Sequence, residues 1–231
     1  MMADRDLTLA SRKVETREKR NIEIFDIEEI EAHFNDNIEL IKSQFKIAEE
    51  LIINGKESEA AEIWRSQIVF LDSAFDFYLH EVVKLGIICV FHGDWEKTDK
   101  YNNLLLKMSN VEEAIHDTED DAWLKQWINK KYASETFMSF SAFKDICNLL
   151  NIDYRIIADA VFYIDGGTVK TVDQIKNRID GLFTRRNQIA HQMDRLHENA
   201  ERLKIEQADV EMYICDIVNI VNAVGEEIRK K

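Results

Sequence analysis

Residues 57–91 read ESEAAEIWRSQIVFLDSAFDFYLHEVVKLGIICVF, and they say more about the architecture than any other part of the chain. Their apolar side chains cover most of the circumference of a helix, which is typical of a central helix packed on several sides. These apolar residues are Ile63, Trp64, Ile68, Phe70, Leu71, Phe75, Phe77, Tyr78, Leu79, Val82, Val83 and Leu85. We therefore expect a long buried helix with other helices packed around it.

One polar stripe interrupts this apolar surface. Asp72, Asp76, His80 and Lys84 follow one another at four-residue spacing, which places them along one side of the helix. On a helix that is otherwise apolar, such a stripe faces either solvent or a buried polar site. The sequence leaves both alternatives open.

The other segments also have helical periodicity. Residues 24–53 carry apolar residues at steps of three and four, which predicts an amphipathic helix that ends at Asn54-Gly55. Further helical patterns occur near 95–108, 111–132, 134–150, 153–164, 172–196 and 210–228. The 231 residues include no proline and only 7 glycines, whereas sheet-rich folds of this size use many of both in turns. The sequence therefore predicts an all-α fold, a helical bundle.

The chain divides into a tail, a first helix and a helical domain. Residues 1–21 are polar and carry a basic cluster, which favours a solvated tail over the alternative of an RNA-binding arm. The cluster consists of Arg12, Lys13, Arg17, Lys19 and Arg20. Residues 22–56 form the long N-terminal helix, which is an addition to the domain of residues 57–231. No internal repeat or low-complexity linker indicates a further division.

Several classes of protein do not fit this sequence. No segment approaches eighteen consecutive apolar residues, so we expect no membrane span, and the first residues lack the apolar region of a secretory signal. Cys89, Cys147 and Cys215 are widely spaced in apolar surroundings, which predicts reduced core thiols in a cytoplasmic protein. No HExxH, CxxC or glycine-rich phosphate loop is present, so we expect no metal and no cofactor.

The string FTRRNQIAH at residues 183–191 contains side chains suited to phosphate chemistry. His191 can transfer protons near neutral pH, and the charged guanidinium of Arg186 can grip phosphate oxygens with two donors. Asn187 and His191 are four residues apart and share a helix face, whereas Arg186 and His191 are about 140° apart on a regular helix. Arg186 and His191 converge if Thr184 caps a helix whose first turn holds Arg186, or if two chains build one site.

This string resembles the R-N-x-x-x-H signature of the HEPN superfamily, in the RRN-x-IAH form of the branch called RiboL-PSP-HEPN. Residues 70–81, FLDSAFDFYLHE, resemble the first core helix of that branch, so the resemblance covers roughly residues 57–228. It implies a helical bundle that forms a homodimer and presents the motif of both subunits in one cleft. It also implies a metal-independent endoribonuclease that cleaves RNA, often in toxin–antitoxin or antiviral defence systems with an antitoxin or other defence protein as partner.

The resemblance assigns the catalytic roles to Arg186, Asn187 and His191. As supporting residues we expect Arg185, a solvated neighbour, and the stripe of Asp72, Asp76 and His80, which in one alternative lines the cleft and pairs with Arg186 or His191. In HEPN toxins regulated by minimal nucleotidyltransferases, the modified target is a tyrosine two residues after the motif histidine. Here that position is Met193, so we do not expect this route of regulation.

The charge distribution matches a nucleic-acid site of limited extent. The formal net charge is −14, which disfavours broad nonspecific binding of nucleic acid. Residues 1–169 carry 19 Lys and Arg against 33 Asp and Glu, whereas residues 170–231 carry 11 of each. All of the net acidity therefore lies outside the segment with the motif, and we expect RNA to be met at one small site.

Two other interpretations remain open at this stage. In one, the domain is a noncatalytic module that binds RNA, a nucleotide or a partner protein, which suits the acidity of residues 1–169. In the other, the motif arises by chance in a structural bundle, with His191 buried and Arg186 turned to solvent.

Overall fold

The computed structural model describes residues 22–116 and 121–231, and within these ranges the regular structure is helical. The helices are α1 (Ile27–Ile53), α2 (Glu57–His92), α3 (Asp99–Asn102), α4 (Met108–His116), α5 (Ala122–Tyr132), α6 (Phe140–Leu149), α7 (Tyr154–Phe162), α8 (Thr171–Gln192) and α9 (Gln207–Arg229). The all-α prediction is thereby confirmed for the part of the chain described. The basic cluster of the N-terminal tail lies outside the described residues.

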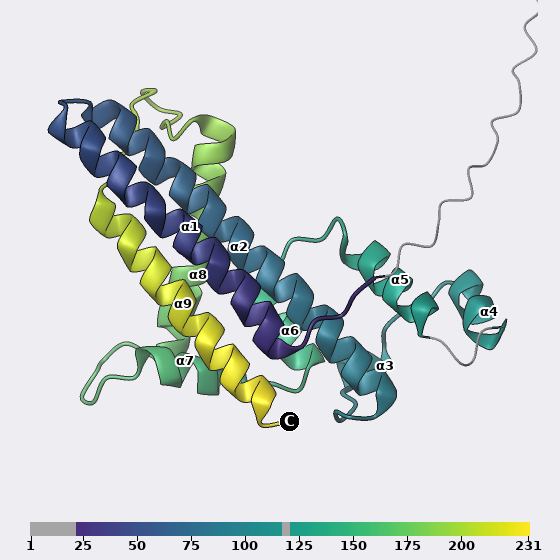
Figure 1. Cartoon of the computed structure of the whole chain (residues 1–231). Coiled ribbons are helices and arrows are strands. Elements are labelled where there is room, and N and C mark those ends of the chain that lie inside the picture. The colour runs from purple at the N-terminus through teal and green to yellow at the C-terminus, as the bar shows by residue number, and fades with distance from the viewer. Residues whose placement is uncertain (1–21, 117–120) are drawn as a thin grey trace, which may run out of the picture.

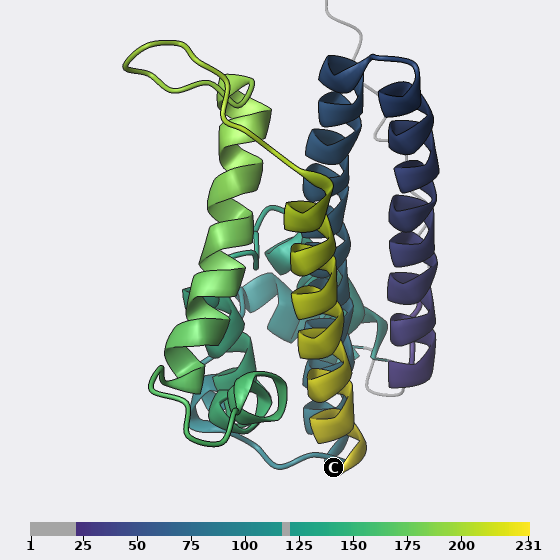
Figure 2. The same ribbon diagram turned by 90° about the vertical axis from the view of Figure 1, so that its left-hand side faces the viewer.

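The central position expected for residues 57–91 is occupied by α2. Helices α1, α8 and α9 all pack along it, as Figures 1 and 2 show. Tyr78 is fully buried on α2, where its ring lies edge-on to Phe34 of α1 and its hydroxyl donates to the Val221 carbonyl of α9. Phe70 and Phe77 depart from the prediction, since about half of each side chain faces solvent.

The N-terminal helix α1 shares this core. Asp26 and Glu29 form a capping box at its start, because each side chain accepts a hydrogen bond from the other residue's backbone N–H. Its apolar face buries Ile30, Phe34, Ile38 and Ile41. The chain then turns at Gly55, whose positive φ of 70° suits a residue without a β-carbon, and α2 begins two residues later.

The segment between α2 and α6 differs from the predicted pair of long helices. Residues 95–108 form only the short α3, because the Asn103 side chain donates to the Asp99 carbonyl and caps the turn. Residues 111–132 form parts of two helices, α4 and α5, separated by residues 117–120, which lie outside the description. In Figure 1, α4 stands away from the main bundle and packs against α5.

The motif helix begins where the pattern over residues 172–196 predicted, but it ends sooner. Because Ile175, Ile179 and Leu182 bury one continuous face, α8 runs unbroken from Thr171 to Gln192, and the alternative in which Thr184 caps a new helix is wrong. The helix ends at Met193, whose φ of 52° is left-handed, so the expected helical spacing through Leu196 is wrong as well.

The structure also bears on two further predictions, one about membrane spans and one about the cysteines. No helix in residues 22–116 and 121–231 is long and apolar enough to cross a membrane. The three cysteines form no disulfide, and Cys147 is buried as predicted. Cys89 is only partly buried, and Cys215 is exposed on α9 beside the buried Ile214, so the prediction of three core thiols is wrong for Cys215.

Candidate functional site

The side chain of Arg186 points from α8 toward the polar stripe of α2. Its Nε atom lies 3.0 Å from Oδ2 of Asp72, a side chain that is only 1% exposed. Arg186 itself remains partly accessible. Of the two alternatives for the stripe, the structure contains the one in which Asp72 faces a polar site and pairs with Arg186.

The rest of the guanidinium is also engaged. Its Nη1 donates to Oδ1 of Asn187 at 2.8 Å, and its Nη2 lies 3.7 Å from the sulfur of Met138. Met138 belongs to the segment between α5 and α6, so Arg186 contacts three parts of the fold. These contacts fix the direction of the guanidinium while leaving one side accessible.

The environment of Asp72 brings the protonation of its carboxyl close to neutral pH. Burial raises the pKa of this carboxyl to about 7; the charge of Arg186 opposes the rise and that of Asp76 adds to it. Neither carboxylate oxygen accepts a well-aligned hydrogen bond in the described part of the chain. The link to Arg186 is therefore a close charge contact, and it weakens when Asp72 takes up a proton near neutral pH.

The next two residues of the stripe anchor the segment that carries Met138. Oδ1 of Asp76 accepts a hydrogen bond from the Phe137 backbone N–H at 2.6 Å, and Oδ2 lies 3.6 Å from Nε2 of His80. The rings of His80 and Phe137 are in contact at a centroid distance of 4.5 Å, tilted by 45° to each other. Asp76 and His80 thus position the chain between α5 and α6 against the guanidinium of Arg186.

His191 lies apart from this cluster. It is exposed near the end of α8 and makes no hydrogen bond or ion pair with any residue that the structure places. Because α8 is regular across the motif, His191 lies about 140° around the helix axis from Arg186. The alternative in which an irregular first turn brings these two side chains together in one chain is therefore excluded, and a site built by two chains stays a prediction.

Arg185 does not support the site as a solvated neighbour, so that expectation is wrong. It pairs with Asp194, a fully buried carboxylate, through contacts of 2.6 and 2.9 Å. Arg65 of α2 reaches the same carboxylate at 2.7 Å. This cluster of Arg65, Arg185 and Asp194 holds the chain that follows His191 against the bundle.

Sequence reasoning missed both Arg65 and Asp194. The one signal for Arg65 was a permanent charge outside the polar stripe of a largely apolar helix. Arg65 also donates to the Leu203 carbonyl, and Arg185 to the Lys204 carbonyl, so both fix the segment before α9. Arg65 and Asp194 are 129 residues apart, which leaves no local spacing from which their contact could be found.

No three His, Cys, Asp or Glu side chains in the described ranges are placed to hold a metal ion. Comparisons with models of protein families, with curated proteins and with solved structures gave no match to this chain. Its resemblance to the HEPN superfamily therefore rests on the residues of the motif and of the first core helix.

Proposed function

We propose that this protein is a metal-independent endoribonuclease in which Arg186 and Asn187 of one copy act together with His191 of a second copy. The observation that carries the proposal is the contrast between the arginine and the histidine of the RRNQIAH string. The arginine is held in a fixed direction beside Asp72, while the histidine is exposed and without a partner among the described residues. A toxin or antiviral defence role follows from the same family resemblance.

The reaction needs a base, an acid and a cation. The ribose 2′-oxygen attacks the neighbouring phosphorus as a base takes its proton, and the bond to the 5′-oxygen breaks as that oxygen receives a proton from an acid. The products are a 2′,3′-cyclic phosphate and a 5′-hydroxyl. In each of the two sites of a dimer, His191 of one copy acts as the base, a water molecule protonates the 5′-oxygen, and the Arg186 guanidinium of the other copy stabilises charge on the phosphorane oxygens.

The contact with Asp72 has two consequences for this chemistry. It holds Arg186 in one orientation, which reduces the entropy lost when a phosphate binds. It also competes with that phosphate for the guanidinium, since a carboxylate and a phosphate use the same donors. Protonation of Asp72 lessens the competition, and the pKa of about 7 makes this possible near neutral pH.

A noncatalytic module is the second proposal, and one observation favours it. All three guanidinium nitrogens of Arg186 already have neighbours, namely Asp72, Asn187 and Met138. An arginine used in this way can tie α8 to α2 with no phosphate involved. The domain would then bind RNA or a partner protein without cutting.

Cleavage of end-labelled RNA in the presence of EDTA separates these proposals. We expect cleavage products that end in 2′,3′-cyclic phosphate from the wild-type protein and none from the His191→Ala variant. The matched control is His197→Ala, which removes another exposed histidine located beyond the end of α8. Undiminished cleavage by His191→Ala would refute the assignment of the site, and tight RNA binding without products would favour the noncatalytic module.

A further inference from the structure

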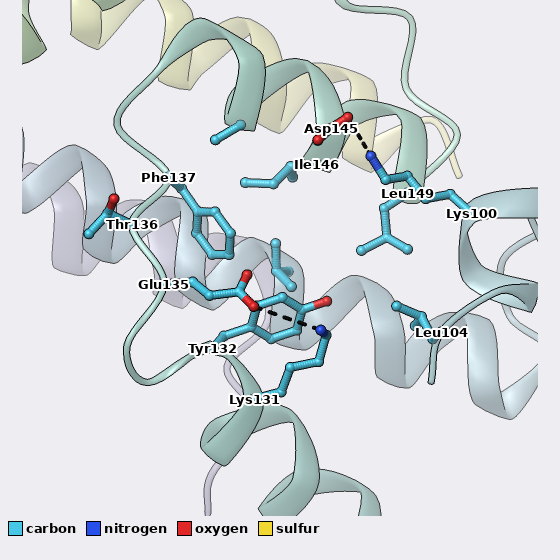
Figure 3. Close-up of a pocket in the computed structure, with 12 residues that line it drawn as sticks. Lys100, Leu104, Lys131, Tyr132, Glu135, Thr136, Phe137, Asp145, Ile146 and Leu149 are labelled. Carbon is cyan, nitrogen blue, oxygen red and sulfur yellow. Dashed lines mark ion pairs between the residues drawn. The ribbon is translucent and has the colours of Figure 1, made fainter. Parts of the chain in front are cut away.

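A pocket between α2, α5 and α6 lies next to the site but is not used by the proposed reaction. Its volume is about 260 Å³, and its interior is mostly apolar (Figure 3). The apolar wall is formed by Val83, Leu104, Phe137, Ala142, Ile146 and Leu149. Pockets for drug-sized ligands occupy about 300–1,000 Å³, so this one suits a ligand of about one ring system.

The charges at the rim of the pocket balance one another. Lys131 lies 3.7 Å from Glu135, and Lys100 forms an ion pair with Asp145, as the dashed lines in Figure 3 mark. A charged ligand would have to separate one of these pairs. A neutral ligand leaves both pairs intact and is therefore favoured.

Tyr132 provides the polar contact inside the pocket. Its side chain is 7% exposed, and its hydroxyl points into the cavity in Figure 3. The hydroxyl has no hydrogen-bond partner among the residues that the structure describes. Burial raises the pKa of Tyr132 to about 12, so the hydroxyl stays protonated and can both donate and accept. The hydroxyl is therefore free to hydrogen-bond a ligand that has donors and acceptors along its edge.

The pocket and the Arg186 site are connected through two consecutive residues, Phe137 and Met138. The Phe137 ring lines the pocket at 5.6 Å from the Tyr132 ring, while its backbone N–H donates to Asp76. Met138, the next residue, contacts Arg186. A ligand in the pocket therefore rests against the same segment that positions the guanidinium.

We propose that this pocket binds one neutral nucleobase, with its flat face on the apolar wall and its edge hydrogen-bonded to the Tyr132 hydroxyl. Single-stranded RNA is recognised through unstacked bases that lie against aromatic side chains and are read along their edges. The further claim that this base belongs to an RNA substrate rests on the proposed function. A free nucleoside carries the same ring, so binding to the pocket is testable without any cleavage.

The first test is calorimetric titration of the full-length protein with adenosine, guanosine, cytidine and uridine. We expect at least one nucleoside to bind and Tyr132→Phe to weaken that binding about fivefold, which is the usual effect of losing one neutral hydrogen bond. Ala142→Leu, which fills the pocket from α6, should remove binding. Tyr163→Phe is the matched control because this tyrosine is exposed outside the pocket. Circular dichroism verifies that each variant folds.

The second test maps the cut positions in a randomised single-stranded RNA. We expect the wild-type protein to prefer one base beside the cut and both pocket variants to lose that preference. Nucleoside binding without RNA cleavage would support the pocket and refute the proposed function. Cleavage with the same base preference in both variants, together with no binding of any nucleoside at millimolar concentration, would overturn the pocket proposal and leave the nuclease proposal standing.

Discussion

The carboxylate of Asp72 on α2 and the guanidinium of Arg186 on α8 approach to 3.0 Å, although the carboxylate is almost completely buried. A buried carboxyl that lacks aligned hydrogen bonds is stabilised in its neutral form, and the adjacent cation only partly restores its charge. The contact therefore joins the motif helix to the central helix with a strength that depends on pH.

The first prediction concerns folding stability against pH. The folded-state pKa of Asp72, about 7, lies above its ordinary value, so between about pH 4 and pH 7 the folded protein retains a proton that the unfolded chain has lost. This group therefore makes the free energy of unfolding decrease as the pH rises, by at most about 4 kcal/mol. Asp72→Asn should lack that contribution, which urea unfolding at pH 5 and pH 8 would measure.

Other titrating groups also change stability with pH, so the informative quantity is the difference between the wild-type and variant curves. Glu39→Gln serves as a control because this exposed carboxylate pairs only with Lys42 on the surface of α1. Curves for wild type and Asp72→Asn that stay parallel from pH 5 to pH 8 would contradict the raised pKa.

The second prediction concerns the cluster of Arg65, Arg185 and Asp194. Asp194→Asn leaves two largely buried guanidinium groups without their shared carboxylate, and such a loss costs about 3–5 kcal/mol of folding stability. Asp153→Asn is the matched control, because its pair with Arg155 is exposed and an asparagine still caps α7. Urea unfolding at pH 7 compares the two, and equal losses would show that the cluster is not important for stability.

The third prediction tests whether the site spans two chains. Arg186→Ala and His191→Ala should each abolish cleavage, yet a mixture that has exchanged subunits should regain about a quarter of the wild-type activity, because half of the dimers contain one intact site of two. The measurement is RNA cleavage after the two variants have been mixed, unfolded and refolded together. The control is each variant refolded alone at the same total concentration.

Failure to regain activity would be informative only if mixed dimers had formed. Two different affinity tags, purified in sequence, isolate the mixed species directly. An inactive mixed dimer would contradict the division of Arg186 and His191 between chains.

The sequence predicted those features of the fold that depend on local pattern. Apolar side chains around the whole of residues 57–91 indicated a central helix, and α2 occupies that place. The four-residue spacing placed Asp72 and Asp76 on one side of α2, where the structure pairs Asp72 with Arg186. These predictions succeeded because helical periodicity fixes which residues share a face.

Tertiary contacts decided what the sequence could not show. Thr184 looked like a helix cap because its hydroxyl suits that role, but the buried face that includes Ile179 and Leu182 continues the helix through it. The helix ends instead just before Asp194, whose φ is 58° and whose carboxylate pairs with Arg185 of α8 and with Arg65 of the distant α2. Neither the left-handed conformation of Met193 nor the partners of Asp194 have a local signature.

The fourth prediction separates the charge of Arg186 from its shape. Arg186→Lys keeps a cation beside Asp72, so we expect the free energy of unfolding to change by less than about 1 kcal/mol. Lysine is a single point charge that cannot contact Asp72, Asn187 and a phosphate together, so cleavage should fall by about a hundredfold or more. Initial rates of RNA cleavage, compared at equal RNA occupancy, measure this loss. Wild-type cleavage rates in Arg186→Lys would mean that only the positive charge matters. A loss of cleavage accompanied by a matching fall in the free energy of unfolding would instead assign Arg186 to packing between α8 and α2.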